Sequence, residues 1–188
     1  SSAQAQMVMT DAEFNLLPAF CRHQSHVSQR HANVPRSIYW ENVLGDSFSH
    51  VHHYCWALVN LGRSYRTGMA KAQRHTALIS AAGDVNYVIE RSRPDMPLLA
   101  EFHTTRGQAL LLAGEAKEAE ASFATARQID PTYWRAYLIW AVALKQNGKN
   151  KEAAELVAKG LEHSPDSKAL KSLANEFQPN SQKKKQDQ

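Results

Sequence analysis

Histidine and cysteine, the side chains that zinc and copper prefer as ligands, are concentrated in the first third of the chain. Those that fall in two short stretches are Cys21, His23, His26, His50, His52, His53 and Cys55. On a helix only residues three or four apart share a face, so His50 and His53 could chelate one ion while His52 points elsewhere. The pattern H-x-H-H-x-C matches no established metal spacing. We therefore interpret the histidines as packed or hydrogen-bonded around a partly buried helix, and we expect no metal site and no cofactor.

Cys21 and Cys55 are the two cysteines of the chain. They can be buried small apolar residues, a structural disulfide or redox thiols. The neighbouring Phe20, Tyr54 and Trp56 favour burial, and the absence of a Cys-x-x-Cys motif argues against redox catalysis. A disulfide needs alpha carbons roughly 4.4–6.8 Å apart, which adjacent helices do not always provide. Burial and a disulfide both remain open.

The chain lacks the local motifs that organise most catalytic sites. It contains no nucleophile elbow, phosphate-binding loop, zinc-protease helix or dinucleotide fingerprint. Its serine, histidine and aspartate residues are scattered over expected helices. We therefore expect that the protein is not an enzyme.

Length and charge narrow the classes of partner. Of the 188 residues, 43% are hydrophobic and 21% are charged, as in ordinary globular domains. The formal charge of +4 is modest, and Lys183, Lys184 and Lys185 contribute to it from a polar stretch, so nucleic acid is not an expected partner. No apolar run approaches the roughly 18 residues that a membrane-spanning helix needs, so no transmembrane segment is expected.

A repeat of 34 residues organises the second half of the chain. The matched positions are Gly107 with Ala141, Gly114 with Gly148, Ala119 with Ala153, and Pro131 with Pro165. Glycine is favoured just after a helix and proline at the start of the next one, while small residues let two helices approach closely. The pattern predicts two helix pairs, at 98–113 with 116–128 and at 133–147 with 151–163. Such units bury their apolar faces by stacking on neighbours.

These residues resemble the tetratricopeptide repeat family, whose 34-residue unit carries small residues at its eighth and twentieth positions and proline at its thirty-second. In this register Ala100 and Trp134 are the first positions of two repeats. The resemblance covers residues 97–177, and 168–177 resembles the capping helix of such arrays because Leu170, Leu173 and Phe177 form one apolar stripe. It implies an all-α fold, a TPR-like right-handed superhelical stack of antiparallel helix pairs with a divergent N-terminal helical half and a C-terminal capping helix.

Residues 11–96 follow the period only faintly, as in the pairing of Phe14 with Phe48. We interpret them as decayed repeats with helices at 11–23, 37–44, 47–61, 70–79 and 84–91, and an irregular connection at 24–35. Thr10 followed by Glu13 predicts a capping box for the first helix. Residues 1–10 are expected to form a flexible leader or the remnant of an export signal, and residues 178–188 a disordered basic tail.

The resemblance also implies a binding groove. In this family the second, fifth, ninth and twelfth positions of each first helix line a concave surface that holds a peptide or a partner helix. In this chain these residues are Glu101, Thr104, Gln108, Leu111, Arg135, Leu138, Val142 and Lys145. Thr104, Gln108, Leu138 and Val142 stand where chaperone-tail binders of the family carry lysine and asparagine, so a chaperone-tail clamp is disfavoured.

Aromatic side chains of the N-terminal half are candidates for an apolar wall, namely Tyr39, Trp40, Tyr54, Trp56 and Tyr65. Two functions fit an apolar groove with a polar rim. One is a non-catalytic adaptor or scaffold in a cell-envelope assembly, and the other is a carrier of a lipid or sterol within an envelope transport system. The N-terminal helices could instead fill the groove as core. The expected leader, and two cysteines that an exported protein could carry as a pair, favour a periplasmic or otherwise exported protein, with the cytoplasm as the alternative.

Overall fold

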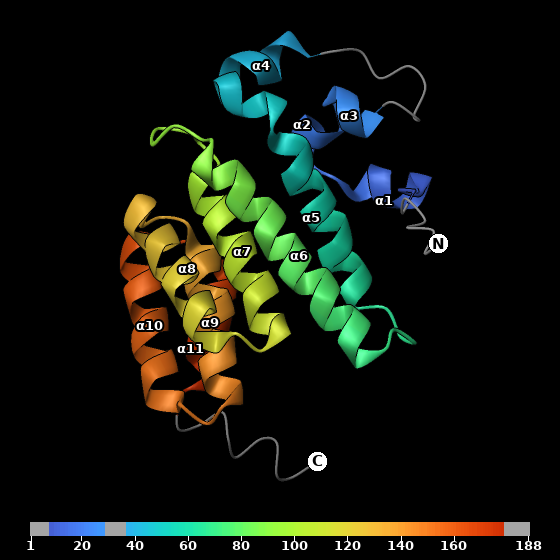
Figure 1. The fold of residues 1–188 in the computed structure, drawn as a ribbon. Coiled ribbons are helices and arrows are strands. Elements are labelled where there is room, and N and C mark those ends of the chain that lie inside the picture. The colour runs from blue at the N-terminus through green and yellow to red at the C-terminus, as the bar shows by residue number, and fades with distance from the viewer. Residues whose placement is uncertain (1–7, 29–36, 179–188) are drawn as a thin grey trace. The chain divides into compact units, whose positions relative to one another are not determined.

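The computed structural model describes residues 8–28 and 37–178 (Figure 1). The chain divides into two compact units, Ser1–Pro97 and Leu98–Gln188. Every regular element of the described residues is helical, and none is a strand. The expected leader at 1–10 and tail at 178–188 lie mostly outside the described residues, as does the larger part of the connection at 24–35.

The N-terminal unit is built on the helix pair α5 (Val51–Ser64) and α6 (Lys71–Glu90), which pack against each other. The elements before this pair are α1 (Asp11–Leu16), α2 (Ala19–Arg22), α3 (Ser25–Ser28), α4 (Ile38–Leu44) and the 3-10 helix η1 (Gly45–Ser49). Both α2 and α3 contact α5. The buried apolar side chains of the α5/α6 pair include Val51, Tyr54, Ala57, Leu61, Leu78, Ala81, Val85 and Val88.

Proline interrupts the helix expected at 11–23. Thr10 caps α1 as expected, because its hydroxyl accepts from the backbone N–H of Glu13 while the Glu13 carboxylate accepts from the backbone N–H of Thr10. The helix ends where Leu17, which precedes Pro18, takes an extended conformation. Helix α2 begins after Pro18, and α3 follows within the expected irregular connection. The expectation of one helix at 11–23 is therefore wrong.

The two helices expected at 70–79 and 84–91 are one continuous helix, α6. Gly83 lies at the expected break, yet it is helical, and a Cβ there would meet nothing within 4 Å. A single interior glycine costs a helix only about 1 kcal/mol. Burial of Leu78 before it and Val85 after it offsets that cost. The helix expected at 47–61 is preceded by η1, begins at Val51 and extends to Ser64.

The C-terminal unit follows the predicted repeat closely. Its helices are α7 (Leu99–Ala113), α8 (Ala116–Ile129), α9 (Trp134–Gln146), α10 (Asn150–His163) and α11 (Lys168–Glu176). Gly114 and Gly148 lie just beyond the ends of α7 and α9 with φ of 95° and 75°, a conformation that glycine adopts without steric cost. Helices α7 and α8 pack as one pair and α9 and α10 as the next, while α11 contacts α9 and α10. The expected all-α, TPR-like architecture with a capping helix is confirmed.

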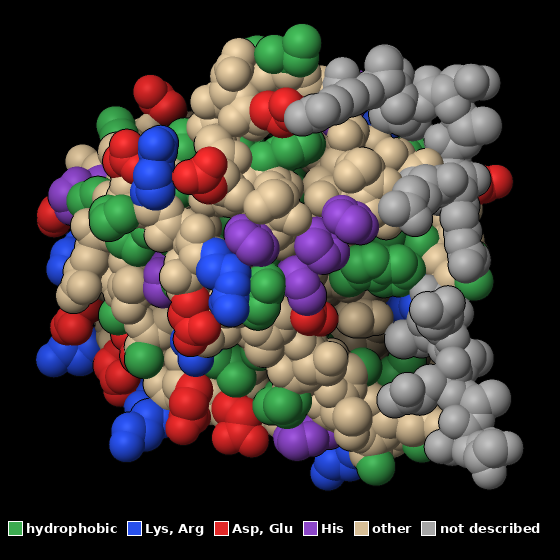
Figure 2. All heavy atoms as spheres, turned by 45° about the horizontal axis from the view of Figure 1, so that its top comes forward, with side chains coloured by type: hydrophobic (Ala, Val, Ile, Leu, Met, Phe, Trp, Pro, Cys, Tyr) green, Lys and Arg blue, Asp and Glu red, His purple; other side chains and the backbone are tan. Residues whose placement is uncertain are grey.

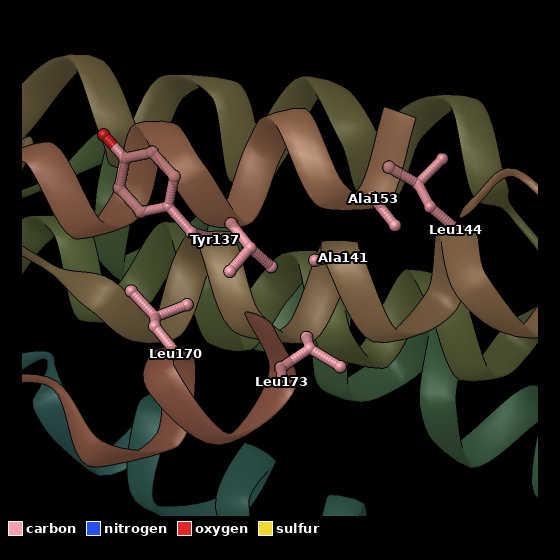
Figure 3. Close-up of a cluster of buried hydrophobic side chains, with 7 residues drawn as sticks. Tyr137, Ala141, Leu144, Ala153, Leu170 and Leu173 are labelled. Carbon is pink, nitrogen blue, oxygen red and sulfur yellow. The ribbon is translucent and has the colours of Figure 1, made fainter. Parts of the chain in front are cut away.

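Small residues hold these helices together at close range. A buried cluster formed by α9, α10 and α11 consists of Tyr137, Ala141, Leu144, Ala153, Val157, Leu170 and Leu173. Figure 3 shows Leu170 and Leu173 of α11 beside the part of α9 that carries Tyr137 and Ala141. A Cβ added to Gly160 would come within 2.9 Å of Leu170 and 3.0 Å of Tyr137. The seam therefore requires glycine at that position.

Candidate functional site

The predicted groove residues lie on α7 and α9, two helices of the C-terminal unit that contact each other. On α7, Glu101, Gln108 and Leu111 are half-buried. On α9, Arg135 is exposed at the first turn, and its guanidinium carbon lies 5.8 Å from the centre of the Trp134 ring. We call the surface that carries these side chains the α7/α9 face.

Thr104, the fifth position of its repeat, does not present its hydroxyl to a ligand. Its side chain donates to the backbone carbonyl of Ala100 at 2.8 Å, one turn earlier in the same helix. Thr104 is only 3% exposed. The hydroxyl is thus used inside α7, which corrects the expectation that it lines an open groove.

The apolar positions of α9 belong to the interior of the unit. Leu138 and Val142 are half-buried and pack against the cluster that α11 completes, as does Phe177 beyond the end of α11. Lys145 forms an ion pair with Glu176 of α11. Lys145 therefore engages the capping helix, while Leu138 and Val142 pack against the buried cluster, so these three positions do not form a free surface.

Tyr133, which the sequence did not single out, adds an electrostatic feature to the α7/α9 face. Burial raises the pKa of Tyr133 to about 12, and the negative charge of Glu101 adds to this shift. The positive charge of Arg135 acts in the opposite direction. Tyr133 therefore remains a neutral phenol under the influence of both an acid and a base.

The aromatic residues proposed as an apolar wall are not gathered on one surface. Tyr54 is 1% exposed and stacks on Phe20 with ring centres 6.1 Å apart, and the ring of Trp40 meets Phe20 edge-on. Tyr39 and Tyr65 are both exposed.

The aromatic residues on and just after α5 also lie at different heights along that helix. Tyr54 lies near the start of that helix, Trp56 is half-buried within it, and Tyr65 lies just after its end. At 1.5 Å per residue, Tyr54 and Tyr65 are about 16 Å apart along the axis. The expectation of a single wall is corrected accordingly.

Cys21 and Cys55 form a disulfide that joins α2 to α5. Their alpha carbons are 5.6 Å apart, within the range that a disulfide needs, and both residues are fully buried. The two cysteines are 34 residues apart, the length of one repeat. The bond anchors the first segments of the chain to the α5/α6 pair.

A buried ion pair provides a second anchor for the N-terminal helices. Arg63 donates to both carboxylate oxygens of Glu13 and to the backbone carbonyl of Val8, and Arg66 also donates to Glu13. The hydrogen bond from Arg63 is the main reason that the pKa of Glu13 falls to about 2. The capping-box pattern identified Glu13, but no local pattern could identify a partner 50 residues away.

The histidines form a row on the surface of the N-terminal unit. Ring centres are 4.8 Å apart between His26 and His52 and 4.4 Å apart between His52 and His53. The ring of His53 also lies 4.2 Å from that of Tyr87. Burial, together with the neighbouring histidines, lowers the pKa of His52. Figure 2 shows several histidine side chains gathered on one face.

The comparisons with known proteins support the repeat assignment in the C-terminal unit. Residues 110–176 match the family model of the tetratricopeptide repeat, and the resemblance is confirmed for this segment. No curated protein and no solved structure matches the chain. Within the described residues, no helix combines the length and the apolar character that crossing a bilayer requires.

Proposed function

We propose that the chain is a non-catalytic adaptor that binds another protein or a peptide on the α7/α9 face. The observation that carries this proposal is the match of residues 110–176 to the tetratricopeptide repeat, a repeat that typically serves as a scaffold for protein interactions rather than as an enzyme. The repeat stacks its helices so that the first helices of successive units share one surface. In this chain, α7 and α9 are those helices.

The chemistry of the face narrows the kind of partner. The face carries the acid Glu101 and the base Arg135, whose charges both act on Tyr133, together with the amide Gln108 and the half-buried Leu111 further along α7. Charged and amide groups of this kind give specificity through complementary polar contacts. The partner that fits is a polar segment that offers both a donor and an acidic group, anchored by one apolar side chain.

We further propose that the adaptor belongs to a cell-envelope assembly and lies in the periplasm. The Cys21–Cys55 disulfide supports it, because disulfides persist in oxidising compartments and are rare in the cytosol. The measurement is alkylation of free thiols in intact cells with a reagent that adds mass. The proposal predicts that the chain takes up no label before reduction and two labels after it, and two labels before reduction would contradict an oxidising location.

The alternative function, a carrier of a lipid or sterol, requires an apolar cavity that encloses its ligand. Among the groove positions, the apolar side chains Leu138 and Val142 pack against the buried cluster of the C-terminal unit. This arrangement favours the adaptor. Native mass spectrometry of the chain after incubation with an envelope lipid extract tests this alternative. A carrier would show a mass increment of a few hundred daltons from the bound lipid.

Charge reversal tests the adaptor directly. Arg135→Glu changes an exposed residue of the α7/α9 face, and Lys159→Glu makes the same change at an exposed position of α10. Quantitative co-purification from cells should lose at least one bound protein with Arg135→Glu and retain it with Lys159→Glu. Identical sets of bound proteins for both variants and the parent chain would remove the proposal.

A further inference from the structure

We propose that His52, through its ring Nε2 atom, and a neighbouring imidazole from His26 or His53 together bind a divalent transition metal ion. All the contacts that support this site lie within the N-terminal unit. The site is therefore independent of protein binding on the α7/α9 face. It also revises the sequence-based expectation that this cluster holds no metal.

The hydrogen bonds of two histidines fix the ring nitrogen that is available to a metal. Nδ1 of His52 lies 3.0 Å from the backbone carbonyl of Ser49, and Nδ1 of His53 lies 3.1 Å from a carboxylate oxygen of Asp84. A carbonyl or an ionised carboxylate can only accept, so each Nδ1 carries the proton and donates it. When such a ring is neutral, its lone pair is at Nε2. Metal-binding histidines are oriented in this way, with the second nitrogen bonded to a carbonyl or a carboxylate.

The spacing of the rings suits a shared ion. A metal lies about 2.0–2.1 Å from an imidazole nitrogen, so two rings can reach the same ion when their centres are within roughly 6 Å. The centre of the His52 ring is 4.8 Å from that of His26 and 4.4 Å from that of His53. His52 is the middle member of the row and has a suitable neighbour on each side. It is therefore the ligand that the site requires.

The rest of the unit holds these rings in place. His26 lies in α3, whose start is organised by the buried Gln24, because the Gln24 side-chain carbonyl accepts from the backbone N–H of His26 at 2.7 Å. The Cys21–Cys55 disulfide ties the preceding helix α2 to α5, which carries His52 and His53. Two segments distant in sequence thus bring their imidazoles together on a supported frame.

The site is an open one. Within residues 8–28 and 37–178, no three histidine, cysteine, aspartate or glutamate side chains are placed to enclose a metal ion. Two imidazoles leave the other coordination positions to water or to a group from a partner. Nitrogen ligands suit zinc, copper and nickel rather than magnesium or calcium.

Isothermal titration of the full chain, without a polyhistidine tag, with zinc chloride tests the site. We expect uptake of one Zn²⁺ per chain, and His52→Ala should lower the association constant at least fivefold. His75→Ala is the matched control, because His75 is exposed on α6 outside the row, and it should change the constant less than twofold. Absence of zinc uptake by the parent chain, or a loss below fivefold in His52→Ala, would overturn the proposal.

A second measurement needs no variant and so does not depend on how the variants fold. Substoichiometric Cu²⁺ broadens the NMR signals of nuclei close to the ion, so the imidazole signals of His52 and of His26 or His53 should disappear first. The neighbour that broadens with His52 is the second ligand. Equal broadening of His75 and His52 would overturn the site.

Discussion

Arg63 donates from Nε and Nη2 to the two carboxylate oxygens of Glu13, at 2.7 and 2.8 Å. Both side chains are less than a tenth exposed. The same carboxylate closes the capping box of α1 by accepting from the backbone N–H of Thr10. One acidic group therefore starts the first helix and also fixes it to the end of α5, 50 residues further along the chain.

Glu13→Gln should destabilise the chain strongly. The amide keeps the shape of the side chain but leaves the Arg63 guanidinium buried without its counter-charge, and breaking a buried pair in this way costs about 3–5 kcal/mol. Asp11→Asn, an exposed change in the same helix, should cost less than about 1 kcal/mol. Denaturant unfolding followed by circular dichroism measures both. Equal losses for the two variants would show that the pair contributes little.

The same carboxylate predicts a dependence of stability on pH. The pKa of Glu13 is about 2 in the folded chain, against an ordinary value of 4.5. A lowered pKa stabilises the fold at pH values above 4.5, and this contribution is lost as the pH falls from 4.5 towards 2. It amounts to about 3 kcal/mol. The unfolding free energy of the parent chain should therefore fall by that much more than that of Glu13→Gln between pH 5 and pH 2, and parallel curves would contradict the assignment.

Removal of the disulfide should weaken the N-terminal unit. The bond closes a loop between residues 34 apart, for which chain entropy predicts a loss of about 3–4 kcal/mol in the double variant Cys21→Ser, Cys55→Ser. Thermal unfolding of the double variant measures the effect, and the parent chain under reducing conditions should behave in the same way. A melting temperature unchanged by both treatments would contradict a structural role for the bond.

Two glycine substitutions of the same kind should have opposite effects. In Gly160→Ala the new methyl group would lie within 3.0 Å of Leu170 and Tyr137, and overpacking of this kind costs about 1–3 kcal/mol. In Gly83→Ala the methyl group meets nothing within 4 Å, so the higher helix propensity of alanine should stabilise α6 by about 0.5–1 kcal/mol. Denaturant midpoints of the two variants that shift in the same direction would contradict this account of the α10/α11 seam.

The helices of the C-terminal unit could be predicted from the sequence because local signals mark their boundaries. Gly114 and Gly148 end α7 and α9, and small residues such as Ala119 and Ala153, both fully buried, mark the seams. Every helix there begins and ends within about one or two residues of its expected position, the variation usual at helix ends. Because each of these residues recurs one repeat later, the helix boundaries could be recognised from the sequence.

The N-terminal unit was less predictable because long-range contacts decide it. The Glu13–Arg63 pair and the Cys21–Cys55 bond join segments that no local pattern connects. The break expected between residues 79 and 84 does not occur, because burial on both sides of Gly83 favours one continuous helix.

The groove could be predicted only in part from the sequence, again because long-range contacts decide which of its residues are exposed. Family positions locate a side chain on its helix, but they do not tell whether a capping helix engages it, as α11 does at Lys145. The part of the groove that remains available could be identified only with the structure in hand.

The central claim is that the α7/α9 face binds a protein, and site-specific photo-crosslinking in living cells tests it most directly. A photoreactive amino acid replaces Arg135 on this face or, as the control, Lys159 on α10, both of them exposed positions. We predict a discrete covalent adduct with one protein after irradiation at position 135 and none at position 159. The same adducts at both positions, or no protein adduct at position 135, would contradict the assignment of this face as the binding surface.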